Sequence, residues 1–288
     1  MIYLLISICC SVTVAVLLKL AKRYKISIPQ AVTWNYLFAI CLSFVFFKPS
    51  MNGLSSTAPS VPVYLALGIL LPVIFWFLAA SVRNIGIVKT DIAQRLSLFI
   101  PILAAYFLFG ENFSILKLCG LCTGFAAIFF TLYKKTKGGQ AGNWLYPITV
   151  FVGFGAIDTL FKQVALIKTI PYTSSLVLIF ALSFLLSLLY IAYQSIIRKQ
   201  KLEPINFICG CILGFFNFFN ILSYLKAHQA MAGNPSTVFA AMNIGVIIVG
   251  TLAGTLIFKE KLSKLNYWGL GLALTAITLI TLSQKYAV

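Results

Sequence analysis

The chain has 288 residues, of which 61% are hydrophobic and 9% are charged, and its formal net charge is +17 at pH 7. A soluble domain carries roughly a quarter charged residues, so the composition excludes an ordinary soluble protein and indicates an integral membrane protein. Five acidic residues and one histidine leave no carboxylate pair for acid–base catalysis and no histidine-based metal site. No Walker A or dinucleotide-binding glycine pattern occurs, so we expect no enzyme activity and no cofactor.

Apolar runs long enough to cross a bilayer, which takes about 20 helical residues, recur along the whole chain. In order they are 2–20, 29–47, 61–82, 88–109, 113–133, 144–167, 172–197, 205–226, 235–258 and 265–283. We therefore predict an all-α integral membrane protein with ten transmembrane helices. The first run carries its basic residues after the apolar segment, the reverse of a signal peptide, so we expect it to be a retained helix.

One segment occurs twice. Residues 103–128 return as residues 252–277, and ten of the 26 aligned positions are identical. Each copy is an apolar run, a polar elbow with one glutamate (Glu111 and Glu260), and a second apolar run. A repeat near half the chain length predicts two copies of one unit.

The two units are residues 1–137 and 138–288, and the linker 134–143 lies at their boundary. Each contains five predicted spans. Because five is odd, the second unit enters the membrane upside down relative to the first, as in the inverted repeats of many secondary transporters.

The basic residues are distributed asymmetrically. Of 22 Lys and Arg, fourteen lie in or beside the loops that follow odd-numbered spans, and five lie on the opposite side. This positive-inside bias makes the odd-numbered loops cytoplasmic and both termini external. The excess charge is therefore a topology signal, and we expect no nucleic-acid partner.

The motif LSLFIPILAAYFLFGE, residues 96–111, is followed by a helix rich in Gly and Ala and has an FKE counterpart at 258–260. This pattern resembles the EamA-type transporters of the drug/metabolite transporter superfamily over essentially the whole chain. The resemblance implies a ten-helix inner-membrane carrier of small metabolites, often an exporter. Many of these relatives have cytoplasmic termini, whereas the charge bias here favours the reverse.

Charges inside predicted spans are costly and usually functional. Arg95 lies seven residues into the run 88–109, about 10 Å deep, and we expect it to line a central cavity rather than snorkel to the surface. Asp158 and Lys162 are one helical turn apart, and the sequence leaves open whether they pair or line the cavity wall. Lys19 lies at a helix end, where snorkelling accounts for it.

Side-chain amides also lie deep in the predicted spans: Gln94, Asn35, Asn217, Asn220 and Asn243. Asn217 and Asn220 are three residues apart, on one helix face, among four phenylalanines. Each amide alone is explained by helix–helix hydrogen bonding. As a set, we expect at least two of them to line the cavity, since an apolar wall with a few polar groups is typical of small-molecule sites.

The elbow glutamates, Glu111 and Glu260, each lie between two apolar runs. A carboxylate near a helix N-terminus accepts unpaired backbone N–H groups. We therefore predict that both are structural or gating residues rather than proton-coupling residues.

Together these features predict a secondary transporter of the cytoplasmic membrane that works by alternating access. The interior charge, three cations against Asp158, favours an amino acid or another carboxylate or zwitterion as substrate. The alternatives are an organophosphate or nucleotide-sugar-like carrier, a non-transporting membrane scaffold, and a lipid-carrier flippase subunit. The expected partners are the lipid bilayer, the substrate and a coupling ion such as a proton, and the sequence is compatible with a monomer or a homodimer.

Overall fold

A computed structural model describes residues 2–24, 26–47, 49, 60–85, 87–132, 145–168, 171–259 and 263–285. The described chain is helical throughout, with no strand among these residues. The helices are α1 (Ile2–Arg23), α2 (Ile28–Phe47), α3 (Val61–Ile85), α4 (Ile87–Leu96), α5 (Phe99–Phe107), α6 (Ile115–Leu132), α7 (Leu145–Leu166), α8 (Tyr172–Ile197), α9 (Pro204–Ala230), α10 (Pro235–Phe258) and α11 (Lys264–Lys285).

The all-α prediction is confirmed for the described residues, and every predicted run except 88–109 coincides with one helix to within about four residues. The run 88–109 instead forms two helices, α4 and α5, separated by a turn at Ser97 and Leu98. Pro101 explains the break, because it has no N–H to donate to the carbonyl of residue 97 and its ring crowds that carbonyl. The Ser97 carbonyl accepts the N–H of Ile100 instead, at 3.0 Å.

The outer surface of the bundle is apolar. Among the described helices, α2, α3 and α7 to α11 are long and apolar enough to cross a membrane. Three further apolar helical stretches, Ile2–Leu18, Ala93–Phe107 and Ile115–Phe130, are shorter. Large side chains such as Phe107 and Trp268 are more than 70% exposed. A soluble monomer rarely exposes such extended apolar surface, so this surface is suited to lipid.

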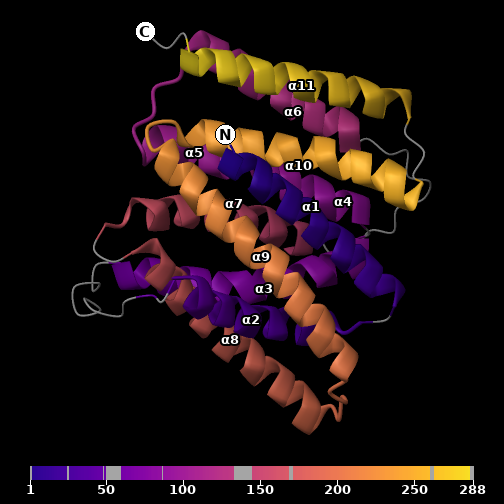
Figure 1. The fold of residues 1–288 in the computed structure, drawn as a ribbon. Helices are drawn as coiled ribbons and strands as arrows, with labels where there is room; N and C mark the ends of the chain where they lie inside the picture. Colours follow the sequence, from indigo (N-terminus) through magenta and orange to yellow (C-terminus); the bar gives the residue numbers. More distant parts are fainter. Residues whose placement is uncertain are drawn as a thin grey trace.

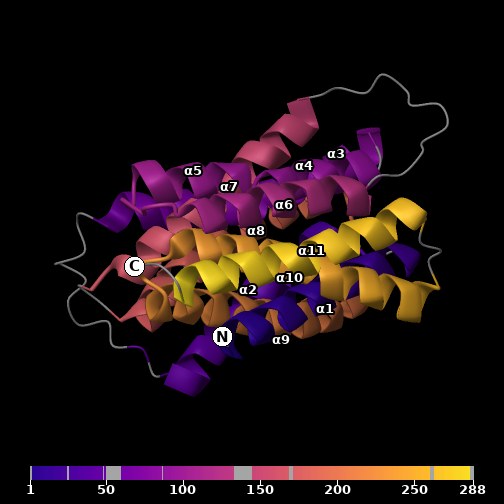
Figure 2. The same cartoon turned by 90° about the horizontal axis from the view of Figure 1, so that it is seen from above.

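The helices run roughly side by side, with α6 and α11 paired along one edge of the bundle and α8 at the opposite edge (Figure 1). The view from above shows the same alignment (Figure 2). Contacts between the first five runs and the last five come in matched pairs, in which each helix is replaced by its counterpart in the other half. The contact of α1 with α9 matches that of α7 with α3, and the contact of α2 with α9 matches that of α8 with α3. The contact of α1 with α10 matches those of α7 with α4 and α5.

Helix α9 packs closely on α2 because it carries two glycines one turn apart. A Cβ atom on Gly210 would lie 2.7 Å from the Ala31 carbonyl oxygen, and one on Gly214 would lie 2.8 Å from the Asn35 carbonyl oxygen. No side chain fits at these distances. The spacing is that of the small-residue motifs that bring transmembrane helices together.

The two elbows share their backbone geometry. Gly110 and Lys259, which occupy equivalent positions in the repeated segment, both adopt left-handed conformations, with φ of 64° and 52°. The hydroxyls of Ser114 and Ser263, also equivalent, then each accept the backbone N–H of the third residue of the next helix at 3.3 Å. The elbow serines are therefore helix caps.

Candidate functional site

Four polar side chains from three helices gather in the interior, and we call them the central cluster: Arg95 of α4, Asp158 of α7, and Tyr224 and His228 of α9. The Tyr224 hydroxyl donates to Asp158 Oδ1 at 3.1 Å. Arg95 lies within electrostatic range of the same carboxylate, on a helix that packs against α7. Asp158 thus accepts a hydrogen bond from a phenol of one helix and lies within electrostatic range of a guanidinium of another.

His228 is fully buried, and its ring contacts are aromatic. Its imidazole packs against Tyr224, with ring centroids 4.6 Å apart, and against Phe239, at 4.7 Å. Neither ring nitrogen has a hydrogen-bond partner among the described residues. Buried polar atoms are nearly always bonded, so these two nitrogens are available polar positions on a ring that packs against Tyr224.

Lys162 is fully buried on α7, but it does not pair with Asp158. Its ammonium donates to the carbonyl of Ala232, in the connection between α9 and α10, at 2.8 Å. It also lies 6.0 Å from the centroid of the Phe109 ring. The one-turn spacing allowed an Asp158–Lys162 ion pair, but that interpretation is wrong, because the lysine side chain extends to a carbonyl beyond its own helix.

A second polar group joins the first elbow to the start of α10, and we call it the Glu111 clamp: Glu111, Lys117, Asn234 and Ser236. Glu111 Oε1 accepts from Lys117 Nζ at 2.6 Å and from Ser236 Oγ at 2.7 Å, and its Oε2 accepts the Ser236 N–H at 2.8 Å. Lys117 Nζ also donates to Asn234 Oδ1 at 3.0 Å. Glu111 therefore caps α10 rather than the helix that follows it in sequence, and its charge favours the positive end of that helix.

The amides of α9 link helices. Asn217 donates to Asn35 Oδ1 of α2 at 3.2 Å, whereas Asn220 accepts from Ser7 of α1 at 2.7 Å. The two residues share a face by spacing, but α1 and α2 flank that face on different sides. Each of them therefore makes a hydrogen bond to a different neighbouring helix.

The recorded bonds of the remaining candidates are local. Asn243 donates to the Phe239 carbonyl, one turn earlier in its own helix, at 3.1 Å. The backbone carbonyl of Gln94 accepts from the Ser97 hydroxyl, in the turn between α4 and α5, at 2.6 Å. Glu260 and the side chains of Lys19 and Asp91 lie outside the described residues.

Sequence reasoning missed five members of these groups: Lys117, Asn234, Ser236, Tyr224 and His228. Lys117 counted as a cation of the even-numbered loops, although a lone lysine six residues after Glu111 in an apolar segment indicates a partner. Tyr224 and His228 lie one turn apart at the end of the phenylalanine-rich segment of α9. His228 is the only histidine of the chain and lies at the end of a predicted span. A titratable residue at such a position usually has a function, so it was the available signal for this site.

The described residues show no grouping of three His, Cys, Asp or Glu side chains that could hold a metal ion, and all seven cysteines are free thiols. Two cavities described below lie at one end of the bundle, and neither is lined by the central cluster. The cluster itself offers a cation, a carboxylate, a phenol and an unpaired imidazole. These groups are chemically complementary to a small ligand with charges of both signs.

Comparison with known proteins agrees with this architecture. The model of the EamA-like transporter family matches residues 1–133. An uncharacterized protein of Haemophilus influenzae is 44% identical over 282 residues, covering 95% of each chain. A solved crystal structure is similar with a TM-score of 0.69 and 15% identity, covering 97% of this chain and 98% of that one, which shows the fold alone. Residues 1–133 therefore match the EamA-like transporter family, as the motif at residues 96–111 predicted, and the long apolar helices are those of a multi-pass membrane protein.

Proposed function

We propose that this protein is a secondary transporter that moves a small zwitterionic or carboxylate-bearing metabolite, of the amino-acid type, out across the cytoplasmic membrane by alternating access. The observation that carries the proposal is that Arg95 and Asp158, a fixed cation and a carboxylate, lie on two helices that pack together and are within electrostatic range of each other. An amino acid presents the complementary pair. The planar guanidinium binds a carboxylate at two points, and Asp158 with Tyr224 offers oxygens to the ammonium.

The same proximity supports an exchange of partners. A buried charge left alone is costly, so removing one partner of a buried pair destabilises a protein strongly. In the empty carrier Arg95 and Asp158 compensate each other, and in the loaded carrier the substrate compensates both. Substrate entry therefore leaves neither charge unpaired.

The position of Arg95 also fits a binding site. It is the penultimate residue of α4, directly before the break at Ser97 and Leu98. Discontinuous helices frame substrate sites in many transporters, where they provide backbone groups free of helical hydrogen bonds.

Two inverted halves, residues 1–137 and 138–288, supply the proposed mechanism. The matched packing sets, the equivalent left-handed elbow residues and the equivalent serine caps support this arrangement. Inverted repeats achieve alternating access by rocking one unit against the other around a fixed site.

The Glu111 clamp is the proposed gate on one side. It joins the elbow of the first half to the first turn of α10 in the second half. By the positive-inside bias, this elbow and the α9–α10 connection are both external. The clamp then closes the external side, and substrate loads from the cytoplasmic side for export.

Transport by purified protein in liposomes tests the proposal. The panel contains amino acids, their des-amino carboxylates, sugar phosphates and single-chain amphiphiles, and flux is measured as counterflow of labelled solute. We expect saturable amino-acid flux. Uptake only of sugar phosphates would establish the organophosphate alternative, movement only of amphiphiles a flippase, and no flux a scaffold.

Variants at matched membrane levels test the site. Arg95→Lys should weaken apparent affinity severalfold, and Arg95→Ala should nearly abolish uptake. Asp158→Asn should impair amino acids more than their des-amino analogues. Lys168→Gln, at an exposed connection, is the control, and Asp91→Ala should leave affinity intact. Unchanged affinity in Arg95→Ala removes Arg95 from the site.

A further inference from the structure

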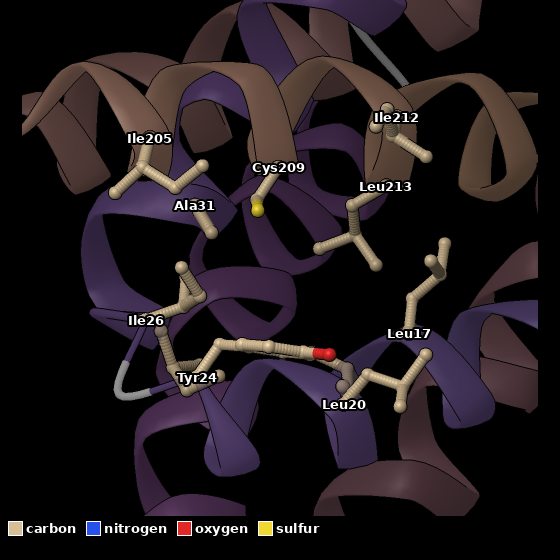
Figure 3. A pocket seen from close by; sticks show the side chains of 11 residues that line it. Leu17, Leu20, Tyr24, Ile26, Ala31, Ile205, Cys209, Ile212 and Leu213 are labelled. Atoms are coloured by element: carbon tan, nitrogen blue, oxygen red, sulfur yellow. The ribbon is translucent and has the colours of Figure 1, made fainter.

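An apolar cavity of about 320 Å³ lies between the end of α1, the start of α2 and the start of α9 (Figure 3). This volume falls in the range of small-molecule pockets, roughly 300–1,000 Å³. The lining is aliphatic apart from Tyr24 and Cys209. The Cys209 sulfur points into the space, and the Tyr24 ring lies across from it (Figure 3).

The cavity is open to the outside of the bundle. Tyr24, Ile205 and Ile212 line it and are 70%, 48% and 45% exposed. On a membrane-spanning bundle, the surroundings of these side chains at this depth are lipid. A slot with aliphatic walls and a lateral opening fits a hydrocarbon chain.

A polar cavity of about 300 Å³ adjoins the apolar one. It is lined by Ser27, Gln30, Gln200, Lys201, Glu203 and Asn206. At three places, residues that are adjacent in the sequence line different cavities. Ser27, Gln30 and Asn206 line the polar cavity, whereas their sequence neighbours line the apolar one: Ile26 and Ile28, Ala31, and Ile205. The two cavities therefore share a boundary along α2 and α9.

Hydrogen bonds fix the shape of the polar cavity. Gln30 Nε2 donates to the Lys201 carbonyl at 2.9 Å, and Asn206 Nδ2 donates to Gln30 Oε1 at 2.8 Å. Asn206 Oδ1 in turn accepts the Ser27 N–H at 3.0 Å. The α8–α9 connection is thus held against the first turn of α2, and the cavity walls are pre-formed.

Among the described residues that line the polar cavity, one is a cation and one is an anion. Lys201 and Glu203 both line it, and neither forms an ion pair within the part of the chain that the structure describes. Both residues lie in the connection between the end of α8 and the start of α9, and a connection that follows a membrane-spanning helix begins near the headgroup layer. The site therefore offers a cation and an anion directly above a slot for an alkyl chain.

We propose that these two cavities form one phospholipid site, with an acyl chain in the apolar cavity and a phosphoethanolamine headgroup in the polar cavity. Lys201 binds the phosphate, and Glu203 accepts hydrogen bonds from the primary ammonium. An anionic headgroup without an ammonium leaves Glu203 facing a phosphate of its own sign. A choline headgroup has no N–H to donate to Glu203. By the positive-inside bias, the site lies in the cytoplasmic leaflet.

The test is lipid binding by the purified full-length protein, measured by native mass spectrometry and by thermal shift. Phosphatidylethanolamine, phosphatidylcholine and phosphatidylglycerol are compared with identical acyl chains. We expect phosphatidylethanolamine to bind at least about fivefold more tightly than the other two. Equal affinities, or preference for phosphatidylglycerol, would overturn the proposal.

Variants separate the two cavities. Cys209→Trp should fill the apolar cavity and weaken binding about tenfold, whereas Ile208→Trp, on the exposed face of the same helix, should leave it unchanged. Glu203→Met, which removes both hydrogen-bond acceptors, should remove the preference over phosphatidylcholine, and Lys201→Gln should weaken all three lipids. Should Cys209→Trp fail to fold, the Glu203→Met comparison still decides, because an unaltered preference in that variant contradicts the assignment.

Discussion

Replacing Lys117 with methionine removes the positive charge of the Glu111 clamp, and the volume of the side chain stays nearly constant. The ion pair is 2.6 Å long, and its side chains are only 4% and 2% exposed. At an effective dielectric constant of about 20, two unit charges at this distance attract by roughly 6 kcal/mol, most of which desolvation offsets. Removing one partner of a buried pair costs about 3–5 kcal/mol. We expect the low end, about 3 kcal/mol, because Ser236 still donates two hydrogen bonds to the carboxylate.

Thermal unfolding in detergent measures this cost. A loss of about 3 kcal/mol should lower Tm by roughly 6–12 °C, because each kcal/mol shifts Tm by about 2–4 °C in a chain of this size. The Lys117→Met, Glu111→Gln and double variants complete a thermodynamic cycle, with Lys168→Met as an exposed control. We expect the double variant to be more stable than the sum of the single losses by about 2 kcal/mol. Additivity within about 0.5 kcal/mol would refute the reasoning.

Four further predictions follow from individual residues. Gly214→Ala should lower the free energy of unfolding by about 1–3 kcal/mol, since its Cβ would lie 2.8 Å from a carbonyl oxygen of α2. The control Gly271→Ala, in open surroundings, should raise it by up to about 1 kcal/mol, and equal shifts in Tm for the two variants would contradict the packing. A reporter fused after residue 288 should show external phosphatase activity, and cytoplasmic fluorescence instead would show that the charge count misled. His228→Phe should raise stability by about 1 kcal/mol, because it keeps an aromatic ring and removes two unpaired nitrogens; a lower Tm would show that the imidazole is bonded in the working protein. Glu260→Gln should retain substantial transport with reduced stability in detergent, whereas lost transport at unchanged stability would point to ion coupling.

The helix boundaries could be predicted because each span is a long apolar run bounded by polar residues. The break between α4 and α5 could not be predicted from hydropathy alone, because residues 88–109 remain largely apolar across the turn. Pro101 carried the missing signal. Its effect is steric and local, so a reading that weighted proline geometry as well as apolarity would have placed the break.

The partners of polar side chains were harder to predict, because they depend on which helices are neighbours. Helical spacing put Asn217 and Asn220 on one face, but α2 bonds the first and α1 the second. The same limitation explains Lys162. Its predicted partner lay one turn away on its own helix, whereas the bond that forms reaches Ala232, 70 residues further along the chain.

The lysine of the Glu111 clamp has no equivalent in the second half of the chain. In the repeat register of 149 residues, Glu111 corresponds to Glu260, but Lys117 corresponds to Asn266, which bonds the cap serine of its own elbow. Opening the clamp side requires the separation of the Glu111–Lys117 ion pair, and on the other side the sequence has no lysine at the equivalent position. In the proposed alternating-access cycle this difference sets unequal barriers, so the empty carrier rests closed at the clamp. Exchange then becomes faster when substrate is supplied from the opposite side, although the equilibrium distribution of the solute is unchanged. A single lysine that is present in only one half would therefore make transport faster in one direction than in the other.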